Sequence, residues 1–86
     1  MDWDIFDAEM TYSPEEGYAG KVSFALHGQR SGYEITLLSK KGLEWSYSLN
    51  FARESGSEEE IEATEQRLEE DDELFDALIE AAKSKL

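Results

Sequence analysis

The chain has 86 residues, of which 40% are hydrophobic and 34% charged, and its 21 acidic and eight basic residues give a net charge of −13 at pH 7. This length suffices for one small domain with a thin core, and the hydrophobic content is too high for a wholly disordered chain. The absence of cysteine excludes a disulfide framework, a thiolate metal site and a thiol nucleophile. The negative charge argues against direct binding to nucleic acid or to an anionic membrane.

The compartment is predicted from the first residues and from the hydrophobic runs. Met1-Asp2-Trp3-Asp4 is acidic, whereas a secretory signal begins with basic residues. No apolar run approaches the roughly 18 residues that cross a bilayer. We therefore expect a cytoplasmic protein that does not enter a membrane.

The first predicted element covers residues 2–12. Its hydrophobic residues fall into two phases of alternation, namely Trp3 and Ile5, followed by Ala8, Met10 and Tyr12. A β-bulge at Phe6-Asp7 would place both sets on one face of a single strand, and a short helix is the alternative. Residues 13–17 follow as a turn, in which Pro14 presets φ and Gly17 tolerates a positive φ.

Residues 21–52 alternate between hydrophobic and polar side chains, as strands with one buried face do. Three runs show this pattern, with hydrophobic positions Val22, Phe24 and Leu26, then Tyr33, Ile35 and Leu37, then Leu43, Trp45, Tyr47, Leu49 and Phe51. The connections at 28–32 and 39–42 are short, so they can join only antiparallel neighbours. The three runs predict a meander, to which residues 2–12 would add a fourth strand.

An acidic linker at 53–57 leads to a predicted helix at 58–85. Ser57 and Glu60 match a capping box at the helix start. On a helical wheel, the apolar side chains gather on one face, which comprises Ile61, Leu68, Phe75, Leu78, Ile79, Ala82 and Leu86. Acids at 69–73 interrupt this face, so the helix is either kinked there or broken, with Asp71 or Asp72 capping a second helix.

These elements predict one α+β domain over residues 1–86. Its three- or four-stranded antiparallel meander would be covered on one face by the acidic C-terminal helix. Because one face of every strand is apolar and the other polar, the helix should pack on the apolar face.

The chain carries no pattern typical of an enzyme. His27 is the only histidine, and its place beside Gly28 at a strand end is typical of a surface turn. The acids at 71–73 lack the glycine and the spacing of a calcium loop, and no glycine loop has the context that binds phosphate. We therefore predict no catalytic residue, no metal and no other cofactor.

The helical segment concentrates the negative charge. Residues 58–80 carry twelve acids, opposed only by Arg67. Over a helix of about 34 Å this is about one net charge per 3 Å, close to the ~3.4 Å between phosphates of one DNA strand. Like charges also recur at a spacing of four, as at Glu65 and Glu69, and each such pair costs about 0.2–0.5 kcal/mol. A field of this strength predicts a basic partner.

The predicted function is that of a non-enzymatic protein that occupies a basic, nucleic-acid-binding surface of a partner protein. In charge and size alone, the chain resembles the small acidic inhibitors that phages direct against restriction or CRISPR proteins by mimicking DNA. The residues predicted to bind the partner are Glu58, Glu59, Glu62, Glu65, Glu69, Glu70, Asp72, Glu73 and Asp76.

The alternative function is that of a small cytosolic adaptor or immunity protein. Such a protein would bind one specific partner through its sheet or loops, and its charge would serve solubility. The surface predicted for this role is the neutral outer face of the sheet, which comprises Ser23, Ala25, Thr36, Ser46, Ser48 and Asn50.

Overall fold

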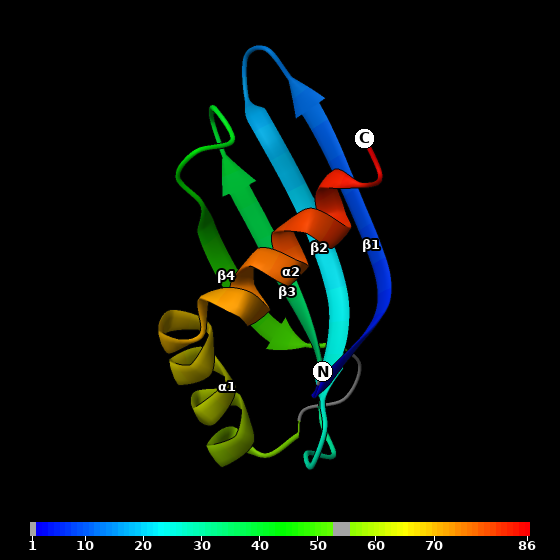
Figure 1. The fold of residues 1–86 in the computed structure, drawn as a ribbon, viewed down its shortest axis with the longest axis vertical. Helices are drawn as coiled ribbons and strands as arrows, with labels where there is room; N and C mark the ends of the chain where they lie inside the picture. Colours follow the sequence, from blue (N-terminus) through cyan, green and yellow to red (C-terminus); the bar gives the residue numbers. More distant parts are fainter. Residues whose placement is uncertain (1, 53–55) are drawn as a thin grey trace.

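The computed structural model describes residues 2–52 and 56–86, and it confirms the α+β class (Figure 1). Four antiparallel strands form a meander in the order β1-β2-β3-β4, and two helices follow and pack on one face of the sheet. The elements are β1 (Trp3–Ser13), β2 (Gly17–Leu26), β3 (Gly32–Ser39), β4 (Ser46–Phe51), α1 (Glu58–Glu70) and α2 (Asp72–Lys83). The predicted linker at 53–57 lies largely outside the described residues.

The N-terminal segment is a strand, so the helical alternative is wrong. The pairing of β1 with β2 shifts by one residue between Ile5 and Asp7, which confirms the predicted bulge. The shift leaves Phe6 without a partner in the ladder and 68% exposed, and it places Ala8 opposite the buried Val22. Both phases of the sequence pattern therefore contribute to one face, because a bulge moves the later side chains across the strand.

The last strand is shorter than its alternation predicted. β4 begins at Ser46, and Leu43, which was expected on the buried face, lies in the β3–β4 loop and is 81% exposed. Gly42 turns the chain there with φ +79, and a Cβ at this position would lie 3.2 Å from the ring of Tyr18. A hydrophobic residue in a loop can share the phase of the strand that follows, so alternation alone does not locate the start of a strand.

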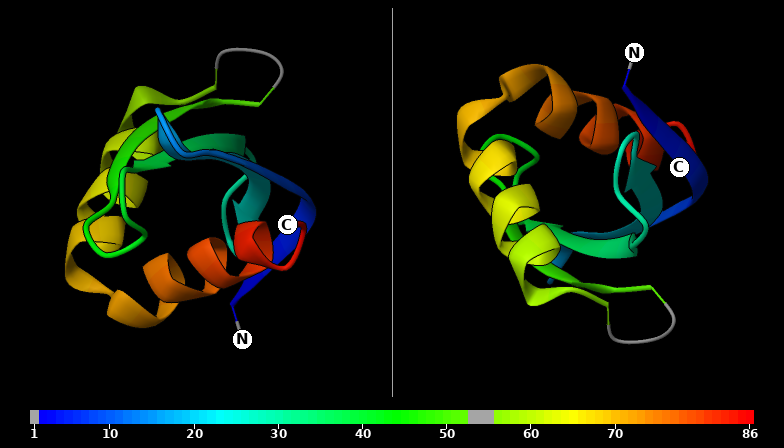
Figure 2. Two further views of the ribbon diagram at one scale, coloured as in Figure 1. Left: turned by 90° about the horizontal axis from the view of Figure 1, so that it is seen from above. Right: turned by 90° about the horizontal axis from the view of Figure 1, so that it is seen from below.

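The core lies between the sheet and the helices. Seen along its long axis in Figure 2, the sheet curves, and together with α1 and α2 it encloses this core. The buried side chains are Met10, Val22, Phe24, Leu26, Tyr33, Ile35, Leu37 and Leu49 from the sheet, with Leu68, Leu74, Leu78, Ile79 and Ala82 from the helices.

The predicted helix is broken into two at Asp71. This residue has φ −108 and ψ 93, its backbone N–H donates to the carbonyl of Arg67 at 2.7 Å, and its carboxylate accepts from the N–H of Leu74 at 3.3 Å. Asp71 thus ends α1 and caps α2. The two helices run in different directions (Figure 1), so the alternative of one kinked helix is wrong.

The break also changes which side chains are buried in α2. Leu74, which lies off the predicted apolar stripe, is fully buried, whereas Leu86, which lies on it, follows the end of α2 and is 61% exposed. A wheel drawn through Asp71 assumes one continuous rotation of 100° per residue, and the extended residue interrupts that rotation. α2 ends at Lys83, two residues before the predicted end.

Candidate partner-binding surface

All nine acids predicted to bind a partner are exposed. Six lie on α1 and three on α2, in the order Glu58, Glu59, Glu62, Glu65, Glu69 and Glu70, then Asp72, Glu73 and Asp76. α1 has 13 residues and a length of about 20 Å, and its seven acids and one arginine keep about one net charge per 3 Å. Beyond Asp71 the acids follow a second axis, so the expected straight row of about 34 Å does not form.

Glu60, an acid outside the predicted set, joins α1 to the β2–β3 loop. Its carboxylate accepts from the Ser31 hydroxyl at 2.7 Å, from the Ser31 N–H at 3.2 Å and from the Arg30 N–H at 3.4 Å. Of the two hydrogen bonds of the predicted capping box, only one is therefore present. The Ser57 hydroxyl does accept from the Glu60 N–H at 3.4 Å, but the Glu60 side chain binds the three donors of the loop.

A second set of hydrogen bonds, one turn further along α1 from Glu60, also joins this helix to the sheet. Thr64 is fully buried, and its hydroxyl lies 2.9 Å from the Glu60 carbonyl and 3.2 Å from Gln29 Oε1. The Tyr33 hydroxyl donates to the same Gln29 oxygen at 2.6 Å. Because each buried polar group finds a partner, the first two turns of α1 are held in one position on the sheet.

The hydrogen bonds of Glu60 predict how stability depends on pH. Donation by Ser31, above all from its hydroxyl, lowers the pKa of Glu60 below its ordinary 4.5, and the hydrogen bond from Arg67 lowers that of Asp2 below 3.8. A carboxyl with a lowered folded pKa stabilises the fold above its unfolded pKa and loses this contribution as pH falls through the folded value. We expect the melting temperature to drop below about pH 4.5.

The variant Glu60→Gln tests this dependence. It should melt lower than the parent at pH 7, and the two melting temperatures should converge as the pH falls through the lowered pKa of the parent carboxyl. Glu59→Gln removes the same charge from a neighbouring exposed side chain and controls for the loss of charge alone. A gap between the Glu60→Gln variant and the parent that stays constant until the acid unfolding of both would contradict the assigned hydrogen bonds.

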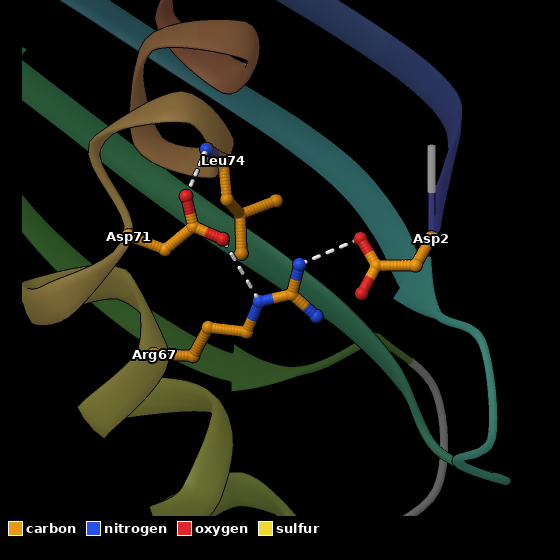
Figure 3. Close-up of polar contacts among 4 residues, drawn as sticks. All are labelled: Asp2, Arg67, Asp71 and Leu74. Carbon is orange, nitrogen blue, oxygen red and sulfur yellow. Dashed lines mark hydrogen bonds and ion pairs between the residues drawn. The ribbon is translucent and has the colours of Figure 1, made fainter.

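Arg67 forms ion pairs with two aspartates of the same chain (Figure 3). Its guanidinium donates to Asp2 Oδ1 at 2.6 Å and to Asp71 Oδ2 at 3.2 Å, and it lies 5.7 Å from the centre of the Trp3 ring. It thus ties the start of β1 to the α1–α2 junction. The spacing of four made Asp71 predictable as a partner, but Asp2 is 65 residues away and no local pattern indicates it.

An open notch of about 490 Å³ lies at the α1–α2 junction. Its lining residues are Ala63, Gln66, Arg67, Glu70, Asp71, Asp72 and Glu73, three of which belong to the predicted set. The carboxylates of Asp2 and Asp71 already pair with Arg67. The acids left over, which are Glu70, Asp72 and Glu73, make the notch negative.

His27 is paired at the surface, and the described residues hold no cluster that could bind a metal. His27 Nε2 lies 3.0 Å from Asp4 Oδ2, and both side chains are exposed, so neither belongs to a cleft. Within residues 2–52 and 56–86, no three His, Cys, Asp or Glu side chains are placed to hold a metal ion. Neither helix in that part of the chain combines the length and the apolar character that a bilayer span requires.

The nine exposed acids are therefore the candidate site. None forms an ion pair with another residue that the structure describes, and the only side-chain hydrogen bond described for them is from Gln66 to Glu70 at 3.2 Å. No family model, no curated protein and no solved structure matches this chain.

Proposed function

We propose that this protein is a non-enzymatic inhibitor of the DNA-mimic type, which occupies a basic, nucleic-acid-binding surface of a partner protein. The observation that supports this most strongly is the exposure of all nine predicted acids on α1 and α2. None of them pairs with a basic side chain that the structure describes, and Arg67, the one basic residue of α1, pairs with Asp2 and Asp71. A basic partner would relieve the mutual repulsion of these acids.

The geometry refines the kind of surface that fits. α1 alone has a charge spacing close to that of one DNA strand, whereas Asp72, Glu73 and Asp76 lie along the direction of α2. The complementary surface is therefore bent, with basic residues along both helix axes. The notch at the α1–α2 junction would accept one lysine or arginine side chain of the partner, held by Glu70, Asp72 and Glu73.

Capture from the source cell tests the proposal. The immobilised protein should retain a partner at 50 mM salt and release it at about 500 mM, since an interface made of many ion pairs weakens steeply with salt. Duplex DNA or RNA added at low salt should also displace the partner. If the partner stays bound at high salt and no nucleic acid displaces it, the proposal is wrong.

The groove beside the outer face of the sheet favours the adaptor alternative. It has a volume of about 1080 Å³, and its lining includes Phe6, Ser23, Ala25 and Glu60. Two of these residues, Ser23 and Ala25, belong to the predicted neutral face, and the exposed Phe6 adds an apolar anchor. A partner that resists salt would direct mutagenesis to this groove, beginning with Phe6→Ser.

A further inference from the structure

The two helices pack on the sheet through different kinds of side chain. α2 contacts β1 and β2, and it contributes Leu74, Leu78, Ile79 and Ala82 to the buried core. α1 contacts chiefly the edge strand β4 and the neighbouring helix, and Leu68 is its one hydrophobic residue in the buried core. In Figure 1, α2 crosses the sheet, while α1 lies at its β4 edge. Burial of apolar surface therefore stabilises the docking of α2 more than that of α1.

Much of the remaining attachment of α1 comes from polar side chains that share one side of the helix, at spacings of four and three. We call them the anchor residues, and they are Glu60, Thr64 and Arg67.

The partners of the anchor residues lie at one end of the sheet. The Ser31 hydroxyl donates to Glu60 at 2.7 Å, and Gln29 Oε1, in the same β2–β3 loop, lies 3.2 Å from the Thr64 hydroxyl. At the start of β1, Asp2 accepts from Arg67 at 2.6 Å. Water can take the place of each of these partners when α1 moves away, so the net contribution of such hydrogen bonds to docking is modest.

α1 is also a weak helix by itself. It has 13 residues, and isolated helices of this length are marginal in water even when their sequence is favourable. Like charges at a spacing of four, at Glu58 and Glu62 and again at Glu65 and Glu69, destabilise it further. Without its contacts to the sheet, α1 would therefore not remain helical, so undocking and unfolding are one event.

We propose that α1 undocks from the sheet and unfolds as a unit while the sheet and α2 stay folded. Asp71 is suited to be the boundary of this unit, because its extended backbone ends α1 and its carboxylate caps α2. The inference goes beyond the proposed function, since it makes the acidic surface conditional. Six of the nine predicted acids keep their helical spacing only while the anchor residues hold α1 in place.

Amide hydrogen exchange of the complete protein, followed by NMR with no partner present, tests the proposal. A unit that opens locally exchanges through a smaller free energy than global unfolding requires. The protection factors of residues 63–70 in α1 should be close to one another and at least about 10-fold lower than those of residues 76–82 in α2. The central strands β2 and β3 should be protected at least as well as α2.

Two substitutions outside α1 remove partners of the anchor residues without changing the sequence of the helix. Ser31→Ala deletes the hydroxyl that donates to Glu60, and Asp2→Asn weakens the ion pair with Arg67. The double variant should speed exchange throughout residues 63–70 by about 10-fold. It should change the exchange of residues 76–82 by less than about 2-fold, because the lost contacts affect only the opening of α1.

Ser23→Ala with Asp4→Asn is the matched control. Asp4 pairs with His27, Ser23 lies on the outer face of β2, and neither side chain has a described hydrogen bond to α1. This control should leave the exchange of α1 within about 2-fold of the parent.

Three results would overturn the proposal. The first is equal protection of α1 and α2 in the parent, which would show that both helices unfold together. The second is an equal acceleration of both helices by Ser31→Ala with Asp2→Asn, and the third is an acceleration of α1 by the control that matches that of this double variant. All three are measured without a basic partner, so they leave the test of the proposed function separate.

Discussion

Changing Glu62, Glu65, Glu69 and Asp76 to lysine should weaken the complex with the basic partner by about 100- to 1000-fold. All four side chains are exposed, so each reversal replaces an attraction at the interface by a repulsion without touching the core. If each contributes about 1 kcal/mol, the four together account for a loss of that size. The loss should appear mostly at low salt, where the charges are least screened.

The same variant should fold as well as the parent. On α2, the reversal at Asp76 turns two like-charged pairs, with Asp72 and with Glu80, into opposite pairs, and the reversal at Glu62 does the same with Glu58. We expect an unchanged or slightly higher melting temperature. A cooperative melt together with the loss of binding would locate the effect at the interface.

Four acids away from the helices provide the matched control. Glu9, Glu15, Glu16 and Glu34 lie on β1, in the β1–β2 turn and on β3, and changing them to lysine alters the net charge equally. This control should bind no more than about 10-fold more weakly, because distant charges act mainly through screened attraction. Equal losses in the two variants would show that the partner senses net charge and not the surface formed by α1 and α2.

The elements with a regular spacing of hydrophobic residues were predictable from the sequence, because this spacing indicates which side chains of a strand or helix are buried. Strand alternation identified the core positions of β2 and β3, and a change of phase located the bulge next to Phe6. Beyond Asp71 the apolar wheel correctly placed Leu78, Ile79 and Ala82 in the core but missed Leu74, which lies next to the extended residue that separates the helices. Whether an acid caps a helix or lies within it depends on packing on both sides, so the sequence left both alternatives open.

The sequence predicted the candidate site as a set of exposed acids. It did not predict which acids would form hydrogen bonds or ion pairs within the fold. Glu60 and Asp2 resemble the other acids in sequence, and only the folded chain brings Ser31 and Arg67 next to them. The ring pairs Tyr12–Tyr18 and Tyr47–Phe75 join β1 to β2 and β4 to α2, so each ring appears in the sequence only as one hydrophobic position of its own element. Tertiary contacts of this kind carry no local signal.

Replacing Gly17 by alanine should destabilise the fold by about 2–5 kcal/mol. Gly17 has φ +86, a conformation that costs an L-residue about 1–2 kcal/mol. The new Cβ would also lie 2.5 Å from the Ser39 carbonyl oxygen and 2.6 Å from the Lys40 Cα, and these are backbone atoms that cannot rotate away. Overpacking of this kind adds about 1–3 kcal/mol. The β1–β2 turn would have to separate from the β3–β4 loop.

Gly28→Ala isolates the steric part of this effect. Gly28 has φ +90, nearly the same conformation, but no described atom lies within 4 Å of a Cβ built there. It should therefore lose only the conformational contribution of about 1–2 kcal/mol. Since 1 kcal/mol corresponds to about 4–8 °C in a domain of this size, the steric difference of about 1–3 kcal/mol should make Gly17→Ala melt at least about 4 °C below Gly28→Ala. Equal melting temperatures would mean that the β1–β2 turn does not pack against the end of β3 in solution.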